Sequence, residues 1–264
     1  MSKTTMVKAI LFDLDDTLVV DEANSRKAMA AAAHLAAELH GIEPERFALF
    51  AWERAEELWT ASPVEPYATP LGIHWTECLW VKFGGSGADM NRVRQWQAEF
   101  CPRLFADALA EQAIAADGAP LAACYARTRR ENQCNFPDAA EVLTTLKRTH
   151  RLGLLTNGDP LAQRSKLATS GLEHFFDAII VSGEHGIGKP DPRIFQIALD
   201  ALDCSPDEAA MVGNSLARDI LGARNANFAH AIWLQIAGAE EFADTTPDAT
   251  ITCLSELPAL FAHF

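Results

Sequence analysis

Residues 8–18 read KAILFDLDDTL, and this stretch decides how the rest of the chain is interpreted. The short apolar run 8–12 ends in carboxylates, which predicts a buried strand with Asp13 at its carboxyl end. Helical patterns separate similar runs that follow at 152–155, 178–181, 209–212, 231–234 and 249–252. Strands that alternate with helices predict βαβ units and a mostly parallel α/β sheet. Such sheets bind ligands at the carboxyl ends of their strands.

Residues 20–136 break this alternation. Ala28, Ala32 and Leu35 fall on one helical face, and helical patterns continue through 91–109 and 121–133. We therefore expect a helical domain inserted after the first strand, with 1–19 and 137–264 forming the α/β domain. Five tryptophans fall in this insert: Trp52, Trp59, Trp75, Trp80 and Trp96. Lining a substrate pocket is one interpretation. For most of them we instead expect packing in the core of the insert itself. Three arginines near its end are expected on a solvated helix face: Arg127, Arg129 and Arg130.

The composition is that of a globular protein. Hydrophobic residues make up 49% and charged residues 22% of the 264 residues, which argues against disorder. The formal net charge of −14 repels phosphate backbones and anionic lipid, so we expect neither nucleic acid nor a membrane as a partner. Six cysteines without C-x-x-C or zinc spacing are typical of a reduced protein. No apolar run approaches a signal-peptide core or a membrane span, so we expect a cytoplasmic location.

Two carboxylates follow the first predicted strand. Asp13 and Asp15 are two residues apart, so in an extended chain their side chains point to the same side. Two neighbouring carboxylates raise one pKa of the pair unless a cation neutralises them. The pair therefore suits a divalent metal together with a nucleophile and an acid/base. A polar loop with an Asx turn, given Asp16 and Thr17, is the alternative interpretation.

The second motif is LLTNG at 154–158, again at the end of a predicted strand. Here the Thr156 hydroxyl and a backbone N–H, with Asn157 beside them, can hold a phosphoryl oxygen. A strand followed by an Asn-Gly turn explains the same residues, and taken alone that interpretation is preferred.

The third motif is GIGKPDP at 186–192. Lys189 can neutralise charge on a phosphoryl group during transfer. The spacing from Gly183 to Lys189 matches a nucleotide-binding P-loop, but Pro190 stands where that loop has Ser or Thr. Because Pro190 also removes a backbone N–H, we exclude the P-loop.

The fourth motif is MVGNSLARD at 211–219, once more after an apolar strand. Asn214 and Asp219 offer oxygen ligands for a hard cation. A helix start capped by Asn214 or Ser215 is the alternative interpretation.

The order of these four motifs, each near the end of a predicted strand, resembles the haloacid dehalogenase superfamily of hydrolases. The resemblance covers 8–18 and 138–252, and it implies a Rossmann-like, doubly wound parallel sheet with an inserted all-helical cap of type one. The resemblance also implies the roles of the site residues. Asp13 is then the nucleophile and Asp15 the acid/base. Thr156 is the catalytic hydroxyl that orients the phosphoryl group, and Lys189 is the catalytic lysine that stabilises its charge. The substrate-binding residues are Thr156, Asn157 and Lys189, and the Mg²⁺ site is Asp13, Asp15, Asn214 and Asp219.

On this resemblance we expect a Mg²⁺-dependent phosphatase that hydrolyses a small phosphorylated metabolite through an aspartyl-phosphate. Asn214 departs from the acidic residue usual in the family after Gly213, so the metal site loses one negative charge. Two alternatives stay open. A 2-haloacid dehalogenase uses the same nucleophile, but that branch lacks an acid at the position of Asp15, because a halide leaves without a proton. A catalytically weak binding protein is supported by Asn214 alone.

Overall fold

The computed structural model describes residues 6–84, 87–236 and 245–264. The chain divides into two compact units, Met1–Val20 with Cys134–Phe264 and Asp21–Gln133. The second unit is slightly shorter than the range 20–136 expected for the insert. The difference arises because Val19–Val20 (β2) pairs antiparallel with Cys134–Asn135 (β3), and both strands belong to the first unit.

A six-stranded parallel sheet forms the centre of the first unit, in the order β5-β4-β1-β6-β7-β8. Its strands are Ala9–Phe12 (β1), Arg151–Thr156 (β4), Ala178–Val181 (β5), Ala209–Gly213 (β6), His230–Leu234 (β7) and Ala249–Ile251 (β8). All six coincide, to within two residues at either end, with the apolar runs read from the sequence. The predicted α/β fold with a parallel sheet is therefore confirmed.

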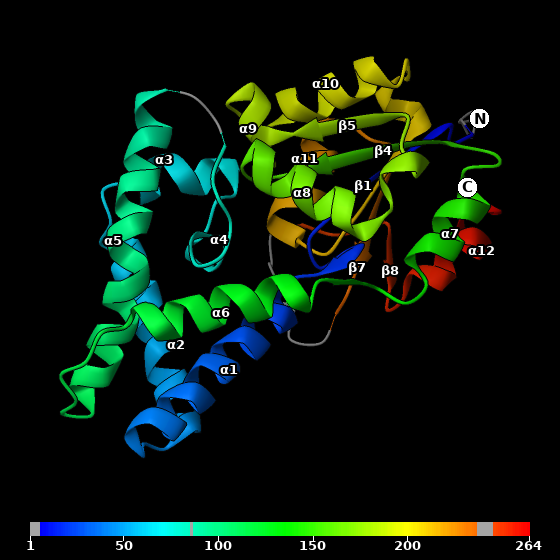
Figure 1. The fold of residues 1–264 in the computed structure, drawn as a ribbon. Helices are drawn as coiled ribbons and strands as arrows, with labels where there is room; N and C mark the ends of the chain where they lie inside the picture. The colour runs from blue at the N-terminus through cyan, green and yellow to red at the C-terminus, as the bar shows by residue number, and fades with distance from the viewer. Residues whose placement is uncertain (1–5, 85–86, 237–244) are drawn as a thin grey trace. The chain divides into compact units, whose positions relative to one another are not determined.

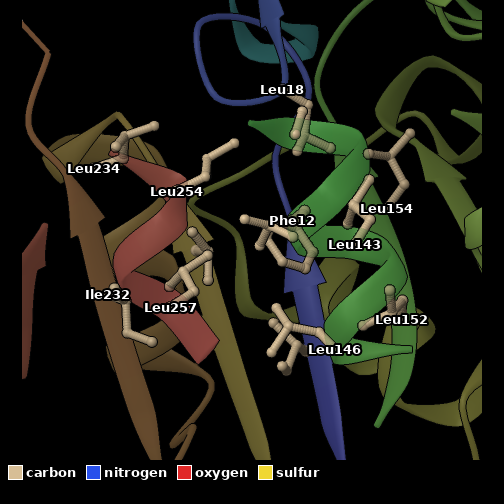
Figure 2. Packing of buried hydrophobic residues seen from close by; sticks show 14 of the residues in the cluster. Phe12, Leu18, Leu143, Leu146, Leu152, Leu154, Ile232, Leu234, Leu254 and Leu257 are labelled. Carbon is tan, nitrogen blue, oxygen red and sulfur yellow. The ribbon is translucent and has the colours of Figure 1, made fainter. Parts of the chain in front are cut away.

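Helices cover both faces of this sheet. Ile10 and Phe12 belong to a core shared with Ala139–Leu146 (α7) and Leu257–Phe261 (α12). These two helices lie side by side (Figure 1), and Figure 2 shows Phe12 among the leucines of this core. Ala9 and Leu11 point into a second core on the opposite face, shared with Pro192–Ala201 (α10) and Leu221–Asn225 (α11). The period of two along β1 thus buries every one of its side chains, as a doubly covered strand requires.

Capped helices follow the strands that carry the predicted motifs. Asp159 caps Pro160–Ser170 (α8), with its carboxylate accepting from the N–H groups of Leu161 and Ala162. Asp191 caps α10 in the same way, and Pro192 occupies its first turn, as the sequence predicts. Shorter elements of this unit are Ser182–His185 (α9), a π-helical turn Leu216–Ile220, and 3₁₀ turns at Glu173–Phe175, Pro206–Glu208 and Leu254–Glu256.

Among the described residues of the second unit, helices joined by loops are the secondary structure, and no strand occurs. Its helices are Glu22–His40 (α1), Pro44–Thr60 (α2), Glu65–Ala68 (α3), Trp75–Cys78 (α4), Ala88–Glu111 (α5) and Ala119–Glu131 (α6), with a 3₁₀ turn at Thr69–Leu71. A row of small residues on α1, Ala28, Ala32 and Ala36, is fully buried and packs this helix among α2 and α6. None of the described helices is long and apolar enough to cross a membrane.

The predicted burial is correct for three tryptophans of this unit and wrong for one of its arginines. Trp59, Trp75 and Trp80 are buried in the core of the unit, as expected. The solvated position expected for Arg129 is wrong, because its side chain is only 1% exposed. Its guanidinium donates to Ser25 and Asp21 at the start of α1 and stacks over the ring of Trp80. The sequence of α6 alone does not reveal these partners, because they are about 50 or 100 residues away along the chain.

Candidate active site

Four motif residues meet at one edge of the sheet. Asp13 directly follows β1, Thr156 ends β4, and Asn214 follows β6. These three strands are adjacent and parallel, so their carboxyl ends lie together. Lys189 reaches the same edge from the loop between α9 and α10, and its ammonium lies 2.6 Å from a carboxylate oxygen of Asp13.

Lys189 lies between two buried carboxylates. Its Nζ donates to Asp13 Oδ1 and to Asp219 Oδ1, at 2.6 Å in each case. Burial alone would lower the pKa of Lys189, but the two carboxylates outweigh it and raise that pKa, so the ammonium stays charged. Burial raises the pKa of Asp13, and the nearby Asp219 raises it further against the opposing effect of Lys189. A second cation beside Asp13 would therefore favour its ionised, nucleophilic form.

A glycine brings Asp219 against the end of β6. A Cβ placed on Gly213 would lie 2.3 Å from Cγ of Asp219, so only glycine leaves space for the carboxyl group there. The second oxygen of Asp219 accepts from the N–H of Ser215 at 2.9 Å. Asp219 is thus fixed on both sides, by a backbone donor and by Lys189.

Thr17 connects the first and fourth motifs. Its hydroxyl lies 3.3 Å from Asp13 Oδ2 and 3.5 Å from Asn214 Oδ1, and it accepts from the N–H of Asn214 at 3.2 Å. Thr17 is fully buried, and the turn that places it passes through Asp16 with a left-handed φ of 55°. Asp13 Oδ2 and Asn214 Oδ1 are therefore both within hydrogen-bond reach of one hydroxyl.

The donor atoms at this edge fit Mg²⁺. Carboxylate and amide oxygens are its preferred protein ligands, and Mg²⁺ takes few of them because it keeps several waters. Asp13, Lys189 and Asp219 together carry one net negative charge when both acids are ionised, and a bound cation would neutralise that charge. Among the described residues no cluster of three or more His, Cys, Asp or Glu is placed to hold a metal. Asn214 follows Gly213, at the position where an acidic residue is usual in proteins with these motifs. A metal here would therefore bind to two carboxylates, neutral oxygens and water.

The side chain of Asn157 holds the main chain of Lys189. Its Nδ2 donates to the Lys189 carbonyl at 3.0 Å, and its Oδ1 accepts from the Lys189 N–H at 2.9 Å. Both polar atoms of the side chain are thereby used within the protein. Asn157 positions Lys189, and its predicted contact with substrate stays a prediction.

Two residues that the sequence analysis missed surround Asp15. Lys166 Nζ lies 3.0 Å from both carboxylate oxygens of Asp15. Gln163 Nε2 lies 2.7 Å from Asp15 Oδ2 and 2.6 Å from Thr156 Oγ1, so it bridges the first and second motifs. Both side chains are 1% exposed, whereas the Asp15 side chain is 26% exposed.

The helical period of α8 contains a signal for these two residues. Gln163 and Lys166 fall on the same face as the buried Ala162 and Leu167. An amide and an ammonium on the apolar face of a helix need partners in the fold, because unpaired buried polar groups are costly. The pattern indicates that partners exist, but it does not say that they are Asp15 and Thr156.

The assembled groups can support attack on a phosphoryl group. Asp13 offers a carboxylate that can act as a nucleophile and whose charge Lys189 balances, Thr156 offers a hydroxyl at the neighbouring strand end, and Asp15 offers a partly exposed carboxyl for proton transfer. These are the elements of nucleophilic catalysis with general acid/base assistance.

A family model described as haloacid dehalogenase-like hydrolase matches residues 7–227. The chain belongs to this family. The resemblance drawn from the four motifs is thereby confirmed, as is the expected hydrolase class.

Two curated relatives are similar over nearly their whole length. The phosphoserine phosphatase of Thermus thermophilus is 37% identical over 257 residues, covering 95% of this chain and 98% of the relative. The N-acylneuraminate-9-phosphatase of Mus musculus is 30% identical over 259 residues, covering 96% of this chain and 93% of the relative. Both are named as phosphatases.

Solved structures of the family share the fold. The protein YfnB from Bacillus subtilis, solved bound to magnesium, has a TM-score of 0.65 at 24% identity, covering 97% of this chain and 99% of its own. A 2-haloacid dehalogenase from Pseudomonas syringae has a TM-score of 0.57 at 26% identity, covering 98% and 99%. The dehalogenase structure shows that the alternative reaction left open by the sequence occurs on this fold, so the fold alone does not select the reaction and the site residues must distinguish the two.

Proposed function

We propose that this protein is a Mg²⁺-dependent phosphatase that hydrolyses a small phosphorylated metabolite through an aspartyl-phosphate on Asp13. The observation that carries the proposal is the juxtaposition of Asp13 with Lys189 and Asp219 beside a strand end that bears Thr156. The two relatives named as phosphatases support the same reaction class.

The residues divide the reaction into two steps. A carboxylate oxygen of Asp13 attacks phosphorus while the bond to the leaving oxygen breaks, and Asp15 gives that oxygen its proton. Water then attacks phosphorus, Asp15 takes a proton from it, and Asp13 leaves as a carboxylate with inorganic phosphate released. Lys189 and Thr156 hold the phosphoryl oxygens, so much of the catalysis is positioning and electrostatics.

Mg²⁺, when bound, supplies the charge that offsets repulsion between the nucleophile and an anionic phosphate. Asp13, Asn214 and Asp219 would hold it, together with the main-chain carbonyl of Asp15. The oxygen donors around Thr17 support this assignment. The six free cysteines support a reducing, cytoplasmic location for the enzyme.

Replacement of the nucleophile tests the proposal. With p-nitrophenyl phosphate and Mg²⁺, Asp13→Asn and Asp13→Ala should lower kcat by at least about 10³-fold, because no carboxylate remains to attack phosphorus. Asp203→Asn is the matched control, since that carboxylate is 95% exposed, and it should retain wild-type turnover. Turnover by both Asp13 variants at the wild-type rate would contradict the mechanism.

A substrate panel separates the alternatives. O-phosphoserine, N-acylneuraminate 9-phosphate, sugar phosphates and nucleotides, each with Mg²⁺ or with EDTA, define the substrate and the metal requirement. Chloroacetate turnover in EDTA would instead indicate a dehalogenase. Asp15 argues against that outcome, because a halide needs no acid to leave. Absence of turnover on every compound would favour a binding protein.

A further inference from the structure

Gln163 and Lys166 project from one face of α8 toward the same carboxylate. They are three residues apart, which places them as neighbours on the helix surface. Lys166 faces both oxygens of Asp15 at 3.0 Å, and Gln163 donates to one of them at 2.7 Å. The Asp15 carboxylate thus has one orientation in which an ammonium and an amide engage it together.

The burial of the Lys166 ammonium costs free energy of folding, and packing of the helix does not require it. A buried ammonium loses favourable hydration, and a buried ion pair often contributes little net stability compared with apolar residues of similar size. Yet Lys166 is 1% exposed on a helix face whose other positions, such as Leu167, pack in the apolar core. An aliphatic side chain would pack there without that cost. The ammonium is therefore explained better by what it does to Asp15 than by stability.

Gln163 connects Asp15, the proposed acid/base, with Thr156 of the LLTNG motif. Its Nε2 lies within 3 Å of Asp15 Oδ2, Thr156 Oγ1 and the Asn157 carbonyl. The close approach needs Gly158, whose φ is +143° and whose added Cβ would lie 2.8 Å from Cγ of Gln163. The Asn-Gly pair of the second motif therefore does more than turn the chain, because it admits the residue that connects Thr156 to Asp15.

We infer that Lys166 and Gln163 are positioning residues for proton transfer by Asp15. The inference rests on the proposed phosphatase function, and it adds two residues to that site. By holding the carboxyl group in one orientation relative to Thr156, they present it to the leaving oxygen in the first step and to the water in the second. Neither residue touches the phosphoryl group in this account, since both act through Asp15.

Dependence on the leaving group tests this role. An alkyl phosphate needs a proton on its leaving oxygen, whereas p-nitrophenolate leaves readily without one. For Lys166→Met, kcat/KM should fall by about 10²-fold on alkyl phosphates and by less than about 5-fold on p-nitrophenyl phosphate. The ratio kcat/KM is the informative measure, because it reports the steps up to loss of the leaving group and is independent of the later hydrolysis.

Two further variants keep the result interpretable. Arg164→Met changes a cation on an exposed part of the same helix, where it pairs with Glu184, and it should lower neither value. Gln163→Leu should show the same selective loss as Lys166→Met, and it serves if the lysine variant does not fold. An equal loss on both kinds of substrate in Lys166→Met and Gln163→Leu, or no loss in either, would overturn the inference. If the wild-type protein hydrolyses neither compound while its Asp13 variants are equally inert, the proposed function fails instead.

Discussion

Lys189 holds together a cluster in which two acids are almost completely buried. Asp13 is 7% and Asp219 is 1% exposed, so both carboxylates are largely shielded from the water that would stabilise their charge. A single ammonium at 2.6 Å from each provides that stabilisation. The cost of removing one partner of a buried ion pair exceeds the net value of the pair, because the remaining charge stays in a poor solvent.

We therefore expect Lys189→Met to destabilise the protein by about 3–5 kcal/mol at neutral pH without Mg²⁺. The free energy of unfolding, measured in urea, checks this value. Added Mg²⁺ should recover part of the loss if the cation binds beside Asp13. Lys147→Met is the matched control, because its ion pair with Asp177 is about one-third exposed, and it should cost less than about 1 kcal/mol. Equal stability of the two variants would contradict this account.

At the scale of elements, two histidines attach the C-terminal segment to the sheet unit. The ring centroid of His150, just before β4, lies 5.4 Å from that of Phe261 in α12. The ring of His230, the first residue of β7, stacks on the ring of Phe264 with their centroids 3.7 Å apart. Burial lowers the pKa of both imidazoles below the usual 6.5, so the fold favours their neutral form. The docking of this segment is consequently coupled to pH.

The direction of that coupling follows from the lowered pKa values. The unfolded chain binds the proton more tightly than the fold, so the contribution to stability is present above pH 6.5 and is lost as the pH falls through the folded-state pKa. The free energy of unfolding of wild type should thus drop between pH 7.5 and pH 5.5. The drop should be smaller in a His150→Gln, His230→Gln double variant, whereas exposed His263→Gln should leave it unchanged. A double variant with the full wild-type drop would refute this coupling.

At the scale of the whole molecule, the hydrophobic core belongs to each unit separately, whereas the net charge belongs to the whole chain. Each of the two units has its own buried core, with aromatic residues such as Trp75 in one and Phe12 in the other. The net charge of −14 belongs to the complete chain and sets its long-range interactions with other anions.

That charge predicts that the protein binds neither duplex DNA nor anionic vesicles. At physiological salt we expect dissociation constants weaker than about 10⁻⁴ M, because a basic surface supplies most non-specific affinity for such partners. Fluorescence anisotropy with a labelled duplex and sedimentation with phosphatidylserine vesicles measure the two affinities. Micromolar binding in either experiment would reveal a local basic patch that outweighs the overall charge.

The sequence by itself determined the order of the strands along the chain and the polar residues that follow them. The apolar run before Asp13 is long enough for a strand and too short for a helix, and its repetition with helices between predicts a parallel sheet. Parallel strands place their carboxyl ends at one edge, so polar residues after several strands must meet. Asp13, Thr156 and Asn214 were found in this way, because local pattern and topology are enough to place them.

Only the tertiary structure decided which side chains engage each of these residues. Lys166 contacts Asp15 across 151 positions of sequence, and Arg129 contacts Asp21 across 108. Such pairs depend on how helices pack, which no local period encodes. For this reason the sequence predicted a polar edge with a nucleophile, while the buried ammonium and amide that hold Asp15 became visible only in the fold.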